Sequence, residues 1–214
     1  RLEEAYQVSA STNAFPEVCG RVCPQDRLCE GNCVVEQAGF GAITIGNLEK
    51  YLTEMAWEKG WVKNLSSQNQ YKQRVAIIGS GPAGMAASAY LTQNGYQVDV
   101  FEKNDRAGGL MIYGIPNFKL DKKIVERRTE WLTESGVVFN LNTEVGKNIS
   151  FQDLEKDYDA ILIATGVYKA RKLDINTTSV DNSIPALDFL IESNRIGLGD
   201  SPSNNKFLNA KDKN

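Results

Sequence analysis

The chain has 214 residues, of which 42% are apolar and 24% are charged. This is the balance of a globular protein, at a length that suits one ordinary domain with a small appendage or two small domains. The formal net charge of −3 gives no reason to expect nucleic acid or an anionic membrane as a partner. No apolar run approaches the roughly 18–20 residues that are needed to span a bilayer.

Histidine is absent from the chain and cysteine occurs four times. The commonest general base and the commonest imidazole ligand of metals are therefore missing. Any chemistry must depend on thiolates, carboxylates or a bound cofactor. The charged residues 1–5 are unlike a signal peptide and predict a cytoplasmic location. Because the chain lacks an initiator methionine, and because the polar run 209–214 looks cut rather than finished, we expect a piece of a longer protein.

Residues 1–61 predict a small helical unit. A short helix is expected over residues 1–10, and residues 11–42, which contain all the cysteines, are expected to be irregular. A second helix is expected over residues 47–58, because apolar residues recur there at helical spacing. These residues are Leu48, Tyr51, Leu52, Met55 and Ala56.

Residues 62–73 are polar and aperiodic, and they predict a linker to a second domain over residues 74–214. In that domain short apolar runs alternate with helical patterns. This alternation predicts an α/β fold with a doubly wound parallel sheet. The expected strands are 74–78, 97–102, 137–140 and 159–164, the first and last of them buried, and the expected helices are 82–94, 121–135, 151–156 and 186–191.

A glycine-rich turn lies between the first strand and the first helix of this domain. Residues 75–84 read Val-Ala-Ile-Ile-Gly-Ser-Gly-Pro-Ala-Gly, which is the G-x-G-x-x-G pattern in the context of a dinucleotide-binding domain. Gly79 permits the tight turn, Gly81 lets the backbone approach a pyrophosphate, and Gly84 lets helix and strand pack closely. A helix N-terminus also offers N–H groups and a positive dipole end to phosphates. The predicted phosphate site comprises Gly79, Ser80, Gly81, Pro82, Ala83 and Gly84.

An acidic residue ends the second expected strand. Glu102 lies 23 residues after Gly79, where a carboxylate accepts hydrogen bonds from a ribose 2′-hydroxyl and repels a 2′-phosphate. The site is therefore predicted to hold FAD or NAD and not NADP. We expect Glu102 and the adjacent Lys103 to contact the cofactor. An isolated glycine motif is often a coincidental turn, but here strand, helix, strand and acid follow in order.

Two further segments favour FAD over NAD. Gly108-Gly109-Leu110 lies in a loop too long for a plain connection. Ala164-Thr165-Gly166 ends the strand that is expected at 159–164. Either segment alone commonly makes a turn, but together with Glu102 they match flavoproteins that have two dinucleotide-binding domains. Gly109, Leu110 and Gly166 therefore join the predicted FAD site.

The four cysteines lie close together in the sequence, at Cys19, Cys23, Cys29 and Cys33. Disulfides are not expected in a chain with cytoplasmic character. Structural zinc sites favour cysteine pairs at the two ends of a longer loop. Iron–sulfur ligation suits a loop of small, turn-forming residues, although the spacing differs from the ferredoxin patterns. Spacing alone predicts a metal site of unknown kind.

Two segments carry specific motifs. Residues 15–24 read Phe-Pro-Glu-Val-Cys-Gly-Arg-Val-Cys-Pro and continue into residues 28–33 and 43–51, and residues 108–120 read Gly-Gly-Leu-Met-Ile-Tyr-Gly-Ile-Pro-Asn-Phe-Lys-Leu. Both segments, and almost the whole chain, resemble the small-subunit family of NADPH-dependent glutamate synthase. Dihydropyrimidine dehydrogenase and the bifurcating ferredoxin–NADP oxidoreductases are close relatives in the same superfamily.

The resemblance implies a helical iron–sulfur domain over residues 1–61, followed by an FAD domain into which an NADPH domain is inserted. It implies two 4Fe-4S clusters, with Cys23 and Cys29 on one and Cys33 on the other, completed by cysteines upstream of this sequence. The remaining ligand is either Cys19 or Glu49, which stands where dihydropyrimidine dehydrogenase has a ligating Gln. We favour Glu49. The upstream cysteines and a second G-x-G-x-x-G are absent, so incomplete sites are expected here.

The resemblance also implies a reaction. NADPH delivers a hydride to FAD, and single electrons pass to the clusters and on to a large subunit that makes glutamate from glutamine and 2-oxoglutarate. Residues 108–120 are expected to contact the flavin end of FAD. The alternatives are a bifurcating ferredoxin–NADP oxidoreductase and a catalytically silent fragment that binds FAD and iron–sulfur clusters. A plain NAD dehydrogenase leaves the cysteines unexplained.

Overall fold

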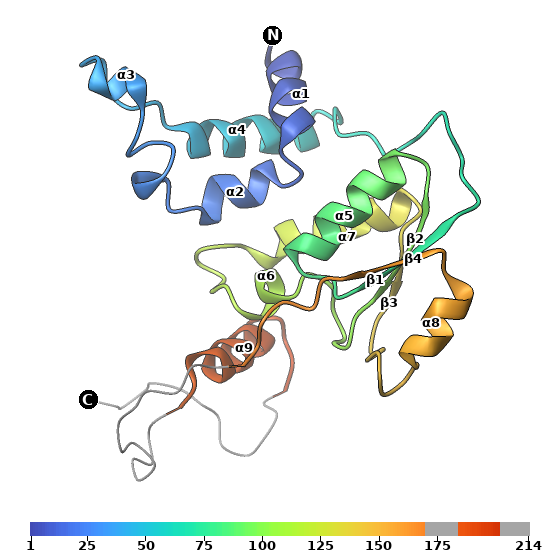
Figure 1. The fold of residues 1–214 in the computed structure, drawn as a ribbon. Helices are drawn as coiled ribbons and strands as arrows, with labels where there is room; N and C mark the ends of the chain where they lie inside the picture. The colour runs from blue at the N-terminus through green and yellow to red at the C-terminus, as the bar shows by residue number, and fades with distance from the viewer. Residues whose placement is uncertain (170–183, 202–214) are drawn as a thin grey trace.

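The structure is a computed structural model that describes residues 1–169 and 184–201 (Figure 1). The polar run 209–214 lies outside these residues. The described chain forms a group of helices at its start and a sheet flanked by helices in its second part. None of the described helices is long and apolar enough to cross a membrane.

The first part is more helical than the sequence indicated. It contains α1 (Leu2–Thr12), α2 (Pro16–Val22), the 3-10 turn η1 (Gln25–Arg27), α3 (Val34–Gln37) and α4 (Ile45–Glu58). The expectation that residues 11–42 are irregular is therefore wrong for α2 and α3. The helix α2 begins with Pro16 in its first turn, where a missing N–H costs nothing, and it is stabilised by packing on α4. A Cβ at Gly20 would lie 2.5 Å from the carbonyl oxygen of Gly46, so only glycine permits this contact.

The second part confirms the doubly wound parallel sheet. The strands β1 (Arg74–Ile78), β2 (Gln97–Phe101), β3 (Val138–Asn140) and β4 (Ala160–Ile163) lie in the order β3-β2-β1-β4. All three pairings are parallel, with Val75 of β1 opposite Val98 of β2 and Ala160 of β4. The first strand, β1, lies inside the sheet, with β2 and then β3 on one side of it and β4 on the other.

Helices cover both faces of the sheet (Figure 1). The helices α5 (Pro82–Gln93) and α7 (Lys122–Glu134) lie on one face and α8 (Phe151–Asp157) lies on the other. Ile77 of β1 joins the large apolar cluster with α5 and α7, whereas its neighbour Ala76 packs with Leu154 of α8. This division follows from the two-residue period of a strand.

The strand β4 is not the buried strand that its apolar sequence predicted. It occupies one edge of the described sheet, and Leu162 and Ile163 are 39% and 63% exposed. A short apolar run has the same composition in a central strand and in an edge strand, so its position could not be read from the sequence.

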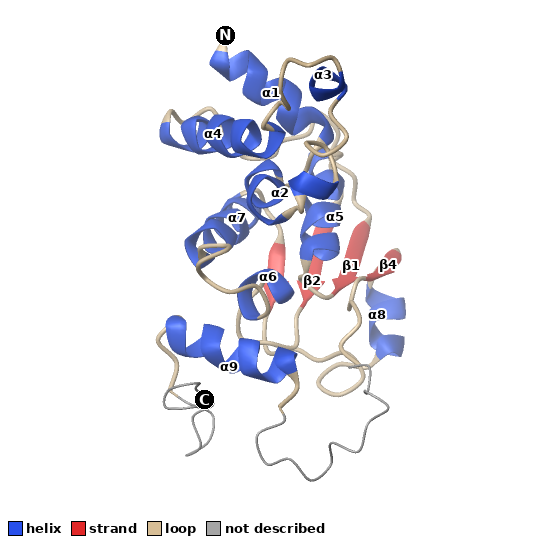
Figure 2. Ribbon diagram, turned by 90° about the vertical axis from the view of Figure 1, so that its left-hand side faces the viewer, coloured by secondary structure: helices blue, strands red, loops and turns tan. Residues whose placement is uncertain are grey.

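The connecting segment 62–73 contains no helix or strand, but it is fastened to the second part. The indole N–H of Trp131 donates to the carbonyl of Lys63 at 2.9 Å, and the N–H of Leu65 donates to the hydroxyl of Ser135 at 2.9 Å. Two further helices, α6 (Leu110–Tyr113) and α9 (Ala186–Gly197), pack together beside α7. Figure 2 shows the N-terminal helices resting on α7 and α5 at the end of the sheet.

Candidate functional site

The turn between β1 and α5 has the close contacts that its glycines predicted. Gly79 has φ +103°, and a Cβ at this position would lie 2.6 Å from the carbonyl oxygen of Ala164. A Cβ at Gly84 would lie 2.0 Å from the carbonyl oxygen of Gly79. These two glycines therefore serve the packing of the turn against β4 and of the helix against the turn.

Gly81 has a different environment. A Cβ at this position would have no atom within 4 Å, so the backbone faces open space. Gly81 is also the N-cap residue of α5, and no side chain caps this end of the helix. The first N–H groups of α5 are thus free of a side-chain cap beside an open volume. This is the arrangement that a phosphate at a helix N-terminus requires.

The open volume is a cavity of about 770 Å³ at the carboxyl ends of the strands. It brings together nine of the eleven residues predicted for the cofactor: Gly79, Ser80, Gly81, Pro82, Ala83, Glu102, Lys103, Leu110 and Gly166. The other two support it from behind. Gly84 packs beneath the turn, and a Cβ at Gly109 would lie 2.8 Å from the Cα of Gly81.

Other lining residues were missed by the sequence analysis. Thr143, Glu144 and Val145 follow β3, and Tyr168 follows β4. Ligands of doubly wound sheets bind outside the carboxyl ends of the strands, and that rule could have pointed to both segments. The ammonium of Lys103 lies 4.5 Å from the ring centroid of Tyr168. Burial, and then the charge of Glu102, raise the pKa of the Tyr168 hydroxyl.

Glu102 is 4% exposed and both its carboxylate oxygens accept hydrogen bonds. Oε2 accepts from the N–H of Ser80 at 3.0 Å and from its hydroxyl at 2.5 Å. Oε1 accepts from the N–H and the side-chain amide of Asn104 at 2.9 and 2.7 Å. The carboxylate therefore also braces the glycine turn, which the sequence analysis did not foresee.

The loop 108–120 begins against the same turn. The N–H of Gly108 donates to the carbonyl and hydroxyl oxygens of Ser80. Gly108 and Gly109 have φ +120° and +54°, which glycine adopts without strain. The ammonium of Lys122 is buried under the loop and donates to the carbonyls of Met111, at 2.9 Å, and Ile115. Burial lowers the pKa of Lys122 to about 8.

The predicted metal ligands are not gathered into one site. Among the described residues no group of three or more Cys, His, Asp or Glu side chains is placed to hold a metal ion. Cys19 lies on α2, Cys23 ends that helix, Cys29 is exposed and Cys33 is buried. Hydrogen bonds from the backbone amides of Ile43 and Glu36 hold the pKa of the Cys33 thiol below its usual value, which favours the thiolate that metals bind.

The two candidates for the remaining ligand share one neighbour. The side-chain amide of Asn13 donates to Glu49 Oε1 at 2.9 Å, and its oxygen accepts from the Cys19 thiol at 3.6 Å. Burial raises the pKa of the Cys19 thiol. Asn13 was not singled out in the sequence analysis, because asparagine has no typical place in a cluster motif.

Comparison with protein families divides the chain in two. Residues 1–61 match the family model for dihydropyrimidine dehydrogenase domain II, 4Fe-4S cluster. Residues 77–140 match the model for the NAD(P)-binding Rossmann-like domain. The cysteine segment and the glycine turn each lie inside one of these matches.

Whole proteins and solved structures are also similar to the chain. It is 51% identical over its whole length to the glutamate synthase (NADPH) small chain of Azospirillum brasilense, and 45% identical over 94% of its length to that of Escherichia coli. It spans 45% and 43% of those two relatives. The structure of Mycobacterium tuberculosis FprA in complex with NADPH matches 58% of this chain and 29% of its own, with a TM-score of 0.53 and 27% identity. The chain belongs to the family of glutamate synthase small chains and their relatives.

Proposed function

We propose that this chain is the cluster-binding and flavin-binding part of an NADPH-dependent oxidoreductase that supplies electrons for glutamate synthesis. The observation that carries the proposal is the open space over Gly81 at the uncapped end of α5, beside the buried Glu102. The cysteine helix α2 packs on the domain that contains this cavity. The nicotinamide specificity and the product are proposed from its relatives, which are small chains of NADPH-dependent glutamate synthase.

FAD fits the cavity for reasons of chemistry. The first N–H groups of α5 can bind the pyrophosphate, and Gly81 leaves the room that it needs. Glu102 can accept from the ribose in exchange for the hydrogen bond that the side-chain amide of Asn104 donates to Oε1. Leu110 lines the cavity, which supports the prediction that the loop 108–120 contacts the flavin end. When bound, FAD accepts a hydride and releases electrons singly.

The match of residues 1–61 to a 4Fe-4S family supports iron–sulfur clusters at the cysteine segment, with further ligands from outside this sequence. We propose that Cys23 and Cys29 ligate one cluster, that Cys33 ligates the other, and that Glu49 supplies the remaining ligand. Glu49 is a carboxylate and so can bind iron, but α4 begins at Ile45 and Glu49 lies beyond its first turn, so the helix dipole gives this ligand no support. Asn13 holds the Glu49 carboxylate and the Cys19 thiol at the same place, so both alternatives are geometrically available.

A partner subunit and a cellular compartment can also be proposed. The relatives are small chains of glutamate synthase, which implies a larger companion, and we propose that the large subunit of glutamate synthase receives the electrons. All four cysteines are free, which suits cluster ligands in the reducing cytoplasm.

The test uses the full-length protein purified without oxygen. We expect FAD by absorbance and by chromatography of the released cofactor, the iron of the clusters, and bleaching of the flavin by NADPH. Replacing Glu102 with Ala should lower the FAD that remains after gel filtration, whereas Glu155→Ala, a change of an exposed glutamate on α8 that does not line the cavity, is the control. Parent protein that contains neither flavin nor iron would overturn the proposal. A large chain that co-purifies distinguishes glutamate synthase from a bifurcating ferredoxin–NADP oxidoreductase.

A further inference from the structure

We propose that the buried ion pair between Glu17 and Arg128 is a positioning device. It holds the cysteine helix α2 at one fixed place on the flavin-binding domain, and so sets the rate at which electrons pass between flavin and cluster. The inference rests on the proposed function and extends it to two residues that no cofactor motif includes.

The pair joins the two parts of the chain. Glu17 lies on α2 and is 0% exposed, and Arg128 lies on α7 and is 7% exposed. Nη2 and Nε of Arg128 donate to the same oxygen, Glu17 Oε1, at 2.6 and 2.7 Å. Figure 2 shows α2 beside α7.

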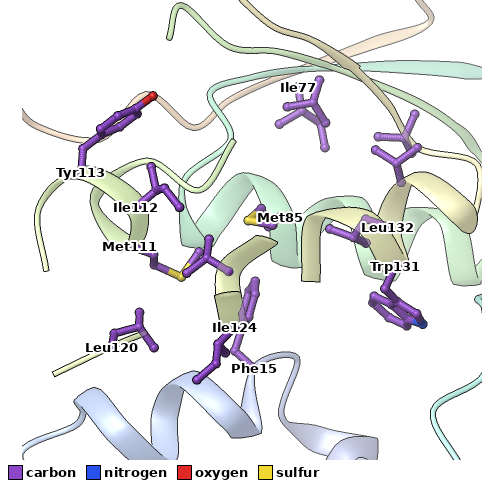
Figure 3. Packing of buried hydrophobic residues seen from close by; sticks show 14 of the residues in the cluster. Phe15, Ile77, Met85, Met111, Ile112, Tyr113, Leu120, Ile124, Trp131 and Leu132 are labelled. Carbon is purple, nitrogen blue, oxygen red and sulfur yellow. The ribbon is translucent and has the colours of Figure 1, made fainter. Parts of the chain in front are cut away.

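Aromatic rings from both sides enclose the guanidinium. It lies 5.4 Å from the ring centroid of Phe15, which precedes α2, and 4.7 Å from that of Trp131 on α7. Figure 3 shows Phe15 beside Ile124 in the apolar cluster of the second part. The same Trp131 donates to the carbonyl of Lys63 in the connecting segment. Arg128 therefore contacts Glu17 of α2 directly, and it contacts Trp131, which binds the connecting segment 62–73.

Stability alone does not explain this pair. Burying two charges costs about as much as their attraction returns, and apolar residues of similar size are often as stable. The second oxygen, Glu17 Oε2, is buried and has no hydrogen-bond partner among the described residues, so the carboxylate is not even fully satisfied. A charged pair differs from an apolar contact because its hydrogen bonds are directional. The two bonds from Arg128 to Glu17 therefore fix the position of α2 on α7.

The pair is connected to both candidate cofactor sites. Glu17 shares α2 with Cys19, and Cys23 ends that helix. Arg128 shares α7 with Val125, which is 1% exposed and packs against Gly108 at the start of the loop 108–120. A shift of α2 along α7 would therefore move the cysteines relative to the flavin loop.

A second ion pair at the same junction provides a control. Glu54 of α4 accepts from Arg21 at 3.1 Å and from Arg127 at 2.8 and 2.9 Å. Its side chain is 37% exposed, so water can replace the lost partner when it is changed. Loss of a partly exposed pair should have a smaller effect, whereas loss of the buried pair should change the position of α2 on α7.

The experiment follows electrons through full-length holoenzyme in two steps. NADPH loses two electrons and becomes NADP⁺, two clusters gain one electron each, and one proton is released to solvent. Stopped-flow absorbance measures the reduction of flavin by NADPH, and freeze-quench paramagnetic resonance measures the reduction of the clusters. FAD and iron are assayed in every variant.

We expect Glu17→Gln to load both cofactors and to keep flavin reduction within about twofold of the parent, while cluster reduction slows about tenfold or more. Glu54→Gln should leave both rates within about twofold. The double variant Glu17→Met with Arg128→Met restores apolar packing without direction, so it should fold, load both cofactors and remain slow in cluster reduction. If Glu17→Gln fails to fold, the rate of cluster reduction in the double variant tests the inference in its place.

Cluster reduction at the parent rate in the double variant would overturn the inference. So would failure of both variants to load cofactors, because the pair would then be a requirement for folding. Parent protein without flavin or iron would instead show that the proposed function is wrong, and the cofactor assay separates the two failures.

Discussion

Gly81 and Gly84 lie three residues apart in the glycine turn and serve different purposes. Each purpose can be tested by adding one methyl group. A Cβ at Gly81 meets no atom within 4 Å, and φ is an ordinary −66°. Gly81→Ala should therefore reduce the free energy of unfolding of the cofactor-free protein by less than about 1 kcal/mol. The methyl group would occupy the space that a pyrophosphate needs, so FAD affinity should fall about tenfold or more.

Gly84→Ala is the matched variant. Its Cβ would lie 2.0 Å from a backbone oxygen, and overpacking of this kind costs about 1–3 kcal/mol. Urea unfolding of the cofactor-free proteins and titration with FAD, followed by flavin fluorescence, separate the two effects. FAD affinity that is unchanged in Gly81→Ala would contradict the proposed position of the phosphates.

The remaining cluster ligand is also a question about single residues. We expect Glu49→Ala in the full-length protein to lose the iron of one cluster, about four atoms, and Cys19→Ser to keep it. Glu58→Ala, a change of another glutamate on α4 that is exposed, is the control and should keep all the iron. Loss of iron in Cys19→Ser and not in Glu49→Ala would assign the ligand to Cys19.

At the scale of elements, the loop 108–120 and the helix α7 are fastened by a buried amine. Lys122 is 5% exposed, and burial lowers its pKa to about 8, from an ordinary value of 10.5. Between these two pH values the unfolded chain binds a proton that the folded protein does not. The free energy of unfolding of the parent should therefore rise with pH from about 8 to 10.5, by at most about 1.4 kcal/mol per pH unit.

The variant Lys122→Met lacks this group, so its stability should not gain from the same pH change. The exposed neighbour Lys123→Met is the control and should follow the parent. Urea unfolding at pH 7.5 and 9.5 measures the difference. Parallel pH profiles for the parent and Lys122→Met would show that the amine is hydrated in the folded protein.

At the scale of the whole molecule, the helical part and the sheet should unfold together. Phe15 is 8% exposed and belongs to the same apolar cluster as Ile77 and Met85 of the second part. The ring of Trp57 on α4 lies 4.7 Å from the guanidinium of Arg127 on α7. We expect one transition, with the same midpoint by tryptophan fluorescence and by far-ultraviolet circular dichroism.

Phe15→Ala tests this coupling. It should lower the free energy of unfolding by about 3–5 kcal/mol and move both midpoints by the same amount. Two separate transitions, or a loss of stability confined to the helical part, would show that the parts fold independently.

Local patterns in the sequence determined the sheet and the glycine turn. The bounds of β1 and the start of α5 at Pro82 agree with the prediction, because apolar period, glycine spacing and proline act over only a few neighbouring residues. The same holds for most of the cavity. Its predicted residues follow the strand ends in a fixed order, and a parallel sheet places those ends at one edge.

The tertiary structure decided what depends on residues far apart in the chain. Glu102 reaches Ser80 across 22 positions, Asn13 reaches Glu49 across 36, and Glu17 reaches Arg128 across 111. The edge position of β4 was also decided by the tertiary structure, because it depends on which strands lie beside it. No local pattern encodes such pairings, since each results from how whole elements pack, and the same residue types occur elsewhere in the chain without them.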